Sequence, residues 1–545
     1  MNPCDVVLDY HERTKHHLHR YARALGYLDW DTQPDPFRRF VGAPLISLPL
    51  PKEDNTPFYN QIYQQDSIPP KPVSLETISE FFFYSLAISA WKSFEHSSWA
   101  LRVNPSSGNL HPTEGYLALQ AMNGLHDRPG VYHYAPKEHG LERRTDFSEA
   151  LWSRLTENLP EGSFLVGLSS IHWRESWKYG ERAFRYCQHD VGHALAALRI
   201  SAALLGWKMV LLSDITDEEI GQLLGLNRAG AYNKDEEEIP DLLVAVVPSR
   251  ILPNPSSKIS KEVFAEVGRG TWMGKPNALS NDHVPWQIIT AVEDACKKNR
   301  VSLPAMNPAK VDEVFESRAM SSQAGKIIRQ RRSAQSMDGK TYISKKQFYA
   351  ILSRVLPHLT SMPWDCIFWQ PFIHLGLFVH RVEGLSPGLY ALIRDRAQSQ
   401  KLKMQMKPQF IWKNAPECPE ELPLFLLEEG DVKSIASSVS CGQDIAGDGV
   451  FSLAMLAEFE PILQKFGASF YRNLFWETGI MGQVLYLEAE AAGIRSTGIG
   501  CFFDDSVHQV FGIQGHAFQS LYHFTVGGPV EDPRLTTLPA YAFLK

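Results

Sequence analysis

The pattern of apolar and polar residues predicts two long helices that resemble each other. Residues 191–207 and residues 478–494 are both rich in alanine, and their apolar positions recur with the period of an α-helix. A glycine stands near the start of each run. Another glycine follows its last turn, where helices commonly end. We expect an amphipathic helix in each segment.

The residues that follow these helices repeat as well. Residues 206–226 read GWKMVLLSDITDEEIGQLLGL, and residues 493–513 read GIRSTGIGCFFDDSVHQVFGI. Glycine opens both stretches, an acidic pair follows the central run, and Leu-Gly-Leu or Phe-Gly-Ile closes them. The spacing between the copies is 287 residues (493 minus 206), and the preceding helical runs keep the same spacing.

Two further pairs of segments follow in the same order. Residues 128–132 (RPGVY) resemble residues 386–390 (SPGLY), and in both the Pro-Gly pair predicts a tight turn in an antiparallel hairpin. Residues 73–86 resemble residues 343–356, and in both a serine N-cap opens a helix. Three ordered pairs predict two copies of one α+β domain, each of about 230–300 residues.

These repeats divide the chain into a lead-in segment and two domains. We place the lead-in segment at residues 1–70, lying across the domain surface, the first domain at 71–300 and the second at 320–545. Residues 285–320 lose the strand pattern and gather charges and prolines, so the boundary between the domains falls there.

Composition narrows the class of protein. The chain has 545 residues and a net charge of −7 without a basic patch, so we expect no nucleic-acid partner. No run approaches the roughly 18 apolar residues of a membrane span, and the N-terminus lacks the apolar core of a signal peptide. The seven cysteines lie far apart without a CxxC pair, which is typical of a reducing compartment. We expect a cytoplasmic protein with no membrane partner.

Several motifs resemble those of a known superfamily. Arg331-Arg332-Ser333-Ala334-Gln335 resembles the RRSxR signature of FMN-dependent nitroreductases. Residues 104–114 (NPSSGNLHPTE) resemble the Pro-Ser-x-Gly motif of the same superfamily, in the form used by SagB-type (azoline) dehydrogenases. Residues 177–187, 10–15 and 28–30 also look SagB-like. The resemblance implies an α+β fold with a mixed sheet flanked by helices, and FMN bound in a dimer interface. A duplicated chain is then its own dimer, and we expect a monomer.

The two copies keep different parts of the implied site. When the copies are aligned on their helix-opening serines, residues 331–333 fall opposite Gln61-Ile62-Tyr63, so the first copy lacks the arginines. When they are aligned on their Pro-Gly pairs, residues 105–108 fall opposite Pro363-Trp364-Asp365-Cys366, so the second copy lacks the serines and the glycine. In dimeric relatives the two motifs line the same FMN from different subunits. The resemblance therefore implies one composite flavin site and one lost site.

The resemblance also implies which residues contact the flavin. The FMN phosphate is a dianion that needs charged donors such as arginine forks. A Pro-Ser-Ser-Gly turn presents amides and hydroxyls, and glycines let the backbone approach a ring. Arg534 matches the family's late basic residue that reaches the phosphate, or is a surface arginine. The cofactor-binding candidates are Arg331, Arg332, Ser333, Gln335, Pro105, Ser106, Ser107, Gly108, Gly498, Ile499, Gly500 and Arg534.

Lys178 and Tyr179 are the catalytic candidates. Within WKYGERAFRYC they match a Lys-Tyr pair that is associated with the base function in azoline dehydrogenases. A lysine acts as a base where burial or neighbouring cations lower its pKa. Arg182 and Arg185 lie close enough to do so if the segment is helical. The alternative is an amphipathic helix with a basic face.

Two other clusters contain residues that could carry chemistry. His189-Asp190-Val191-Gly192-His193 resembles a metal-binding helix, but no third ligand cluster accompanies it, so we expect no metal and a histidine that is buried or points toward substrate. Ser440-Cys441-Gly442-Gln443-Asp444 reads as a turn that helps to shape the pocket. The sequence contains neither a P-loop nor a G-x-G-x-x-G motif after a strand.

Two functions of different classes remain. The first is an FMN-dependent oxidoreductase, with hydride transfer through flavin N5, favouring dehydrogenation over nitro reduction. Its partners are a small-molecule or modified-peptide substrate and an external electron acceptor or donor. The second is a flavin-free or flavin-sequestering partner scaffold with a degenerate fold. The retained complementary motifs favour the enzyme, because a scaffold has no need to keep either of them.

Overall fold

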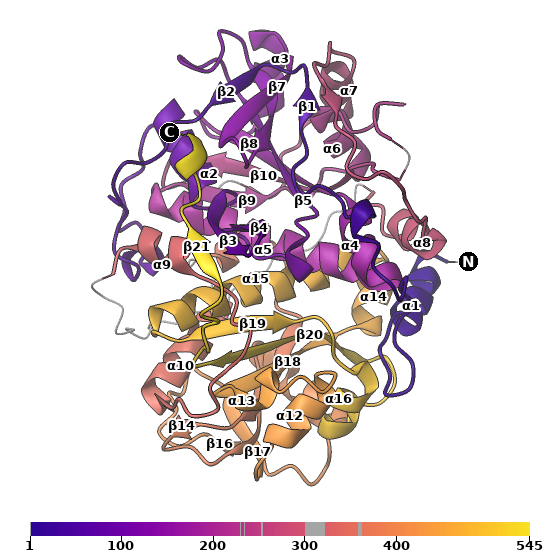
Figure 1. The fold of residues 1–545 in the computed structure, drawn as a ribbon, viewed down its shortest axis with the longest axis vertical. Helices are drawn as coiled ribbons and strands as arrows, with labels where there is room; N and C mark the ends of the chain where they lie inside the picture. Colours follow the sequence, from indigo (N-terminus) through magenta and orange to yellow (C-terminus); the bar gives the residue numbers. More distant parts are fainter. Residues whose placement is uncertain are drawn as a thin grey trace.

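The molecule consists of two stacked lobes (Figure 1). The structure is a computed structural model that describes residues 2–228, 230–233, 235–251, 254–299, 322–357 and 362–544. We call residues 2–299 the first lobe and residues 322–544 the second lobe. Each lobe is built on one seven-stranded sheet with helices packed against it, so the expectation of a duplicated α+β fold is confirmed.

The two large sheets share one topology. Their strand orders are β2-β7-β6-β5-β8-β10-β9 and β16-β17-β15-β13-β18-β20-β19. The first sheet contains β2 (Leu45–Ser47), β5 (Thr113–Leu119), β6 (Gly130–Ala135), β7 (Gly140–Asp146), β8 (Phe164–Ser170), β9 (Lys208–Leu211) and β10 (Ile239–Val247). The second contains β13 (Ile373–Val379), β15 (Gly388–Leu392), β16 (Lys413–Asn414), β17 (Leu424–Glu429), β18 (Phe451–Glu458), β19 (Arg495–Ile499) and β20 (Phe518–Gly527).

Strand direction differs from the mixed sheet that the resemblance implies. A mixed sheet has parallel and antiparallel neighbours, whereas every pairing within the two large sheets is antiparallel. The connection between consecutive strands β6 and β7 is short, which suits antiparallel neighbours and is too short for a parallel crossover. The remaining strands are β1 (Phe40–Val41), β3 (Ile88–Phe94), β4 (Ser97–Arg102), β11 (Lys275–Pro276), β12 (Ile343–Ser344), β14 (Val382–Glu383) and β21 (Thr536–Leu538).

Helices cover the sheets and fill the space between them. Those of the first lobe are α1 (Pro3–Arg13), α2 (Leu75–Phe83), α3 (Glu149–Thr156), α4 (His172–Tyr179), α5 (Ala183–Leu204), α6 (Asp217–Leu224), α7 (Lys261–Gly268) and α8 (Gln287–Ala295). Those of the second are α9 (Ala324–Gln330), α10 (Lys345–Arg354), α11 (Ser399–Gln405), α12 (Lys433–Val439), α13 (Ile445–Asp448), α14 (Glu460–Phe466), α15 (Phe470–Ala491) and α16 (Asp504–Phe511). Short 3₁₀ turns are η1 (Trp30–Thr32), η2 (Gln61–Tyr63), η3 (Ser107–Asn109), η4 (Gly180–Arg182), η5 (Trp364–Cys366), η6 (Arg396–Gln398) and η7 (Ala542–Leu544).

The repeat seen in the sequence is a repeat of elements. Helices α5 and α15 are each 22 residues long. They begin and end 287 residues apart (470 minus 183 and 491 minus 204), as do α6 and α16 (504 minus 217 and 511 minus 224). The latter two end at Gly225 and Gly512, both in the left-handed conformation that favours glycine. Ser74 and Ser344 cap α2 and α10 as expected.

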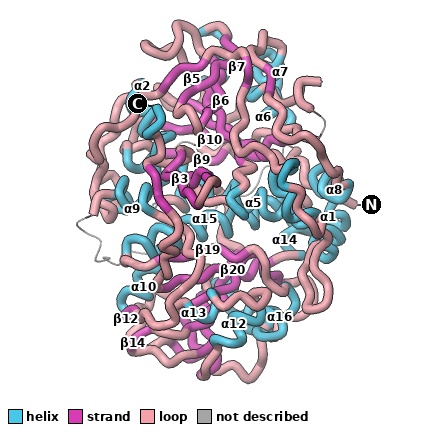
Figure 2. The backbone as a smooth tube through the Cα atoms, viewed as in Figure 1, coloured by secondary structure: helices cyan, strands magenta, loops and turns pink. Residues whose placement is uncertain are grey.

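The central helices α5 and α15 are more deeply buried than amphipathic helices usually are. Figure 2 shows both in the middle of the molecule, between the strands of the two lobes. Every residue of α5 is buried, including polar ones. The reason is that α5 and α15 pack on each other as well as on the sheets, so their polar side chains bond to protein groups of either lobe instead of to water, as Gln188 does to Asp241 and Arg199 to Asp365.

The Pro-Gly pairs do not form tight hairpin turns. Gly130 and Gly388 open strands β6 and β15, after longer connections at residues 120–129 and 380–387. A Cβ on either glycine would collide with a backbone carbonyl oxygen of the neighbouring strand, β7 or β17. Glycine is therefore required by the close approach of a strand, not by the turn.

The lead-in segment is not confined to the surface. Strand β2 is the edge strand of the first sheet, and Tyr59 and Tyr63 are buried. Helix α1 reaches the second lobe, where Nδ1 of His11 lies 3.1 Å from the hydroxyl of Tyr471. Because the apolar residues of the segment cover the cores of both lobes, it is part of the fold.

The C-terminal segment crosses in the opposite direction. Strand β21 of the second lobe pairs with β3 of the first lobe, and Tyr541 donates a hydrogen bond to the carbonyl oxygen of Pro136 at 2.9 Å. The lobes are thus tied by an arm at each end of the chain (Figure 1).

Residues 300–321, which include most of the expected domain boundary, lie outside the described residues. In the described part of the chain, no helix has the length and apolar character needed to cross a membrane.

Candidate functional site

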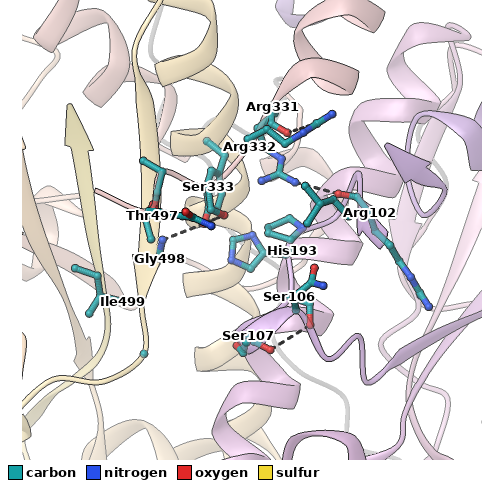
Figure 3. A pocket seen from close by; sticks show the side chains of 18 of the residues that line it. Arg102, Ser106, Ser107, His193, Arg331, Arg332, Ser333, Thr497, Gly498 and Ile499 are labelled. Carbon is teal, nitrogen blue, oxygen red and sulfur yellow. Dashed lines mark hydrogen bonds between the residues drawn. The ribbon is translucent and has the colours of Figure 1, made fainter. Parts of the chain in front are cut away.

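A cavity of about 420 Å³ opens between the two lobes, within the range of about 300–1,000 Å³ typical of small-molecule sites. Figure 3 shows Arg331–Ser333 and Thr497–Ile499 of the second lobe on one side, Arg102 and Ser106 of the first lobe on the other, and His193 between them. Most predicted site residues line it: Pro105, Ser106, Ser107, Gly108, Tyr179, Arg331, Arg332, Ser333, Gln335, Gly498, Ile499 and Gly500. The two retained motifs therefore meet in one cavity.

The arginine motif reaches from the second lobe into the first. It follows the end of α9, and Arg331 donates a hydrogen bond from Nη2 to the carbonyl oxygen of Arg102 at 3.0 Å. Arg332 lies against Ser89 of β3, with Nη1 3.3 Å from the serine hydroxyl. Ser333 contacts the hydroxyl of Tyr486 on α15 at 2.8 Å. These contacts hold the motif across the interface.

The Pro-Ser motif is held against helix α5. The carboxylate of Asp190 accepts hydrogen bonds from the backbone N–H and the hydroxyl of Ser107, both at 3.0 Å. The hydroxyl of Ser106 accepts a hydrogen bond from the N–H of His111 at 2.7 Å. Gly108 has φ 58°, and a Cβ there would lie 2.5 Å from the hydroxyl of Tyr179. The turn is therefore fixed by α5 and packs against α4.

Glycines 498 and 500 are required by neighbouring tyrosines. A Cβ on Gly498 would overlap the hydroxyl of Tyr522, and a Cβ on Gly500 would lie 2.5 Å from the ring of Tyr186. The N–H of Gly498 donates to the hydroxyl of Tyr486 at 3.0 Å. Three tyrosines thus surround this strand end, and the space that the glycines leave is taken by protein rings.

The cavity wall carries an excess of positive charge. Its cations are Lys92, Arg102, Arg331, Arg332 and Arg495, and its carboxylates are Asp190, Glu531 and Asp532. The buried Nε atoms of Arg102 and Arg331 have no hydrogen-bond partner among the described residues, and neither has Nδ1 of His193. Buried donors are rarely left unsatisfied. Such a wall suits an anionic ligand.

Burial shifts the pKa of several of these groups. It raises the pKa of the Asp190 carboxyl to about 7, although hydrogen bonds from Ser106 and Ser107 oppose the shift. Burial also lowers the pKa of the Arg102 guanidinium to about 10. The pKa of His193 falls to about 3, because of burial and the nearby charge of Arg331, so its imidazole is neutral at pH 7.

Of the two catalytic candidates, Tyr179 lines the cavity and Lys178 does not. Tyr179, at the end of α4, lines the cavity. Lys178 is not part of the wall, and its amine lies 5.3 Å from the centre of the Tyr179 ring. Arg182 and Arg185, which we expected beside Lys178, instead bind the two oxygens of the buried Asp504 carboxylate at 3.0 and 2.9 Å. The buried Asp504 carboxylate needs cationic partners, because a buried charge without one is strongly destabilising.

Arg534 lies outside the cavity wall. Its side chain is 72% exposed and pairs with Asp532 at 2.7 Å. The structure therefore does not bring it together with the other predicted flavin contacts.

The repeat relates the cavity to a second position on the other side of the interface, and protein side chains fill that position. Arg199, the counterpart of Tyr486, binds Asp365 with two hydrogen bonds of 2.8 and 2.6 Å. Trp364 is buried and donates from Nε1 to a backbone carbonyl oxygen. Between Leu211 and Asn473 there remains a cavity of about 20 Å³. The residues that stand at the lost motifs are thus occupied by protein partners or buried, as Ile62 and Tyr63 are.

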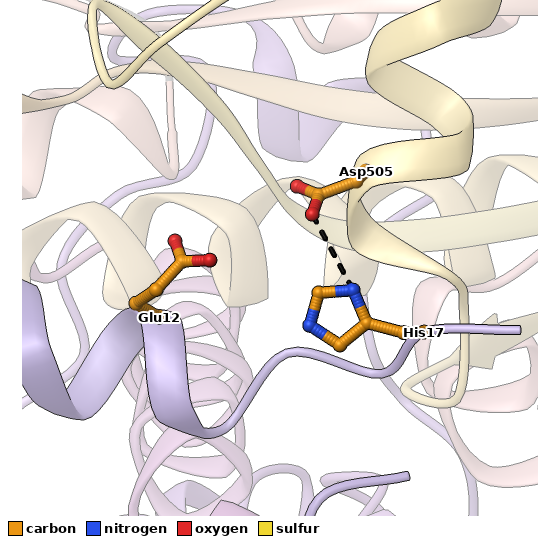
Figure 4. A group of neighbouring side chains, drawn as sticks. All are labelled: Glu12, His17 and Asp505. Atoms are coloured by element: carbon orange, nitrogen blue, oxygen red, sulfur yellow. Dashed lines mark ion pairs between the residues drawn. The ribbon is translucent and has the colours of Figure 1, made fainter. Parts of the chain in front are cut away.

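The candidate metal ligands have other partners. His189 lies 3.0 Å from the hydroxyl of Thr478, and His193 lies 3.3 Å from the hydroxyl of Tyr522. Figure 4 shows another group, Glu12, His17 and Asp505, which the sequence analysis did not single out. The amine of Lys15 lies 2.8 Å from the Glu12 carboxylate and 3.0 Å from that of Asp505. A lysine thus supplies the positive charge that a cation would bring.

Sequence reasoning missed several residues of the wall. The sequence analysis considered Asp190 only as part of a metal motif. Its place one helical turn before His193, which puts the two side chains on one face, was the signal that could have identified it as a site residue. His193 belongs to the same cluster, and Tyr186 lies in the motif of residues 177–187 without having been assigned a role. Other missed wall residues, which carried no motif, include Arg102, Tyr486, Arg495 and Tyr522.

Comparisons with known proteins agree with this architecture. Residues 328–528 match the model of the nitroreductase family. A protein of Methanocaldococcus jannaschii, provisionally described as a nitroreductase, is 26% identical over 157 residues, which are 28% of this chain and 75% of that protein.

Solved structures extend the likeness to the whole chain. A crystal structure from Anabaena variabilis, also provisionally described as a nitroreductase, covers 96% of this chain and 99% of its own with a TM-score of 0.68 and 20% identity. That likeness shows the fold. A structure of the Escherichia coli microcin synthetase McbBCD complex covers 45% of this chain and 92% of its own at 18% identity, and its TM-score of 0.26 supports no argument.

Proposed function

We propose that this chain is an FMN-dependent oxidoreductase that holds one flavin in the cavity between its lobes. One observation carries the proposal. The motif halves that the two copies retain line a single cavity, while residues at the lost positions, such as Tyr63, Trp364 and Asp365, are buried among protein groups. The match of residues 328–528 to the nitroreductase family supports a redox role for that cavity.

The residues of the wall fit a flavin nucleotide. Arg331 and Arg332 would hold the phosphate, since guanidinium groups bind phosphate oxygens through two N–H groups. The partnerless buried Nε atom of Arg331 is a donor that such an anion would satisfy. Ser106, Ser107 and Ser333 offer hydroxyl groups to the uncharged parts of the molecule.

When bound, FMN supplies the acceptance and donation of hydride at N5. The chain itself supplies orientation and proton handling. Asp190 holds a proton on its carboxyl near neutral pH, because burial raises its pKa to about 7. Lys178 and Tyr179 remain the predicted base pair. Of the two, Tyr179 presents its hydroxyl at the wall, and Lys178 would act through it.

The partners that we propose are those that the sequence predicts. The two lobes contact each other as subunits of a dimer would, so we propose a monomer that needs no second chain. The substrate is a small molecule or a modified peptide. We propose that the enzyme dehydrogenates it rather than reducing a nitro group, and that an external electron acceptor or donor completes the redox cycle. The domain limits, at residues 71–300 and 320–545 after the lead-in segment, remain predictions.

The test is the flavin content of the purified full-length protein. We expect a yellow protein that releases one FMN per chain on denaturation, and a mass in solution of one chain. Two flavins per chain would contradict the filled second position. A colourless protein that does not bind added FMN would favour the flavin-free scaffold instead.

A further inference from the structure

Two cysteines meet at the wall of the cavity. Cys441 lies between α12 and α13, and Cys501 follows β19, 60 residues further along the chain. Their sulfur atoms are 2.7 Å apart. Two unbonded thiols ordinarily keep a wider separation, and a disulfide bond measures about 2.05 Å. Only a small movement separates this pair from a covalent bond.

The surrounding backbone holds the two loops together. The side-chain amide of Gln443 donates to the carbonyl oxygen of Cys501 at 3.0 Å. The N–H of Phe503 donates to the carbonyl oxygen of Val439 at 2.8 Å. Cys441 itself has φ 56°, a left-handed conformation that costs energy for a residue with a Cβ. The fold therefore maintains the contact between the sulfurs at some cost.

The pair is accessible and the other cysteines are not equivalent to it. Neither Cys441 nor Cys501 is fully buried, and Cys501 lines the cavity. Cys4 and Cys418 are also partly exposed, but each sulfur lies 3.4 Å from a backbone carbonyl oxygen. A reagent that enters the cavity can thus reach Cys501.

The two thiols differ in acidity. The hydrogen bond with Cys441 lowers the pKa of Cys501, and the positive charge of Arg182 acts in the same direction. The same hydrogen bond and burial raise the pKa of Cys441. Cys501 therefore becomes the thiolate first, and a thiolate is the form that attacks disulfides.

We propose that Cys441 and Cys501 are a redox-active pair that cycles between dithiol and disulfide by exchange with low-molecular-weight thiols and disulfides. The Cys501 thiolate attacks one sulfur of an incoming disulfide, whose other half leaves as a thiolate and takes a proton from water. Cys441 then gives its proton to water and attacks Cys501 Sγ, which releases the second half as a thiol. The pair loses two electrons and two protons, and the small disulfide gains them.

This site does not depend on the proposed flavin. It places a two-electron carrier directly after Gly500, in the same wall as the predicted flavin contacts. Thiol–disulfide exchange can be measured on protein without FMN, so failure of one proposal leaves the other standing.

The first experiment counts thiols in the full-length protein. The reduced protein is equilibrated with excess oxidised glutathione under native conditions, then unfolded and alkylated. We expect two of the seven cysteines to escape alkylation, a mass lower by two hydrogen atoms, and a peptide that links residues 441 and 501. A Cys418→Ser variant is the matched control and should lose the same two thiols. Seven alkylated cysteines, or a bond between other cysteines, would overturn the proposal.

The second experiment assigns the order of attack. Cys441→Ser should accumulate one glutathione on Cys501, because no second thiol remains to resolve the mixed disulfide. Cys501→Ser should accumulate markedly less in the same time. If Cys501→Ser traps glutathione as fast as Cys441→Ser, the assignment of Cys501 as the attacking thiol is wrong.

Discussion

Gly192 on α5 and Gly479 on α15 lie against each other at the centre of the interface, and they occupy the same position in the two copies, 287 residues apart (479 minus 192). A Cβ on Gly192 would fall 2.9 Å from the Cα of Gly479, and a Cβ on Gly479 would fall 2.7 Å from the Cα of Gly192. The two helices therefore touch backbone to backbone. Because both also carry residues of the cavity wall, such as Asp190 and Tyr486, this contact sets the width of the site.

The first prediction concerns this contact. Gly479→Ala should destabilise the protein by about 1–3 kcal/mol, the usual cost of overpacking, since backbone cannot yield as a side chain does. Chemical unfolding followed by circular dichroism measures it. Gly268→Ala is the control, because the added Cβ would come no closer than 3.3 Å to Gln222, which a shift of a few tenths of an ångström relieves. Equal unfolding midpoints for Gly479→Ala and the wild type would contradict the argument.

The second prediction tests whether both lobes bind one flavin. Arg332→Ala in the second lobe and Ser107→Ala in the first should each weaken FMN binding. Hydrogen bonds to charged groups contribute about 1.5–3 kcal/mol, so the Arg332→Ala dissociation constant should rise roughly 10- to 100-fold. Quenching of flavin fluorescence gives the constants. Arg534→Ala, which changes an exposed side chain outside the wall, should bind FMN as the wild type does. The reverse pattern would mean that the phosphate lies at Arg534.

The third prediction separates flavin binding from chemistry. Tyr179→Phe removes the hydroxyl at the wall, so turnover of a substrate found by screening should fall by the roughly 10²–10⁴-fold typical of a lost acid–base group. Lys178→Ala should lower turnover less, because the amine lies behind the Tyr179 ring. Both variants should keep a normal flavin spectrum and be reduced normally by dithionite. Unchanged turnover in both would remove this pair from the mechanism.

The sequence predicted the fold and the meeting of the two motifs, because ordered repeats indicated a duplicated domain and the family resemblance indicated motifs that line one site from two subunits. Residues such as Arg332 and Ser107 were found through that resemblance, and both line the cavity. Tyr186 and Tyr522 were not found, since the sequence pattern assigns an aromatic residue in a buried helix or strand to the core. Their contacts with Gly500 and Gly498 are visible only in the structure. The role of Arg534 was left open because its local pairing with Asp532 has no signature in the sequence.

The fourth prediction concerns pH. Burial raises the pKa of Asp190 from 3.8 to about 7, so the folded protein favours the protonated carboxyl. The stability due to this group is fully present below about pH 4 and is lost as the pH rises through about 7. Asp190→Asn cannot ionise and can keep one oxygen for Ser107. It should therefore be more stable than the wild type by a few kcal/mol above pH 7, with little difference near pH 4.

Thermal unfolding at a series of pH values measures this difference. Asp127→Asn, which changes a side chain that is 89% exposed, should show no pH-dependent gain. If the gain of Asp190→Asn is the same at pH 4 and pH 8, the carboxyl does not titrate in this range.

The fifth prediction concerns the filled position opposite the cavity. Asp365→Ala removes the two hydrogen bonds between the buried Arg199 guanidinium and Asp365, and breaking a buried ion pair typically costs about 3–5 kcal/mol. The protein should be much less stable to urea, yet the folded fraction should still release one FMN per chain, because this position holds no flavin. Asp365→Asn keeps one acceptor for Arg199, so its stability should lie between those of Asp365→Ala and the wild type. It also provides a folded sample if Asp365→Ala does not fold. A loss of FMN from folded Asp365→Asn would mean that the flavin lies on this side of the interface, beside Trp364, and that the cavity at Arg331 serves another ligand.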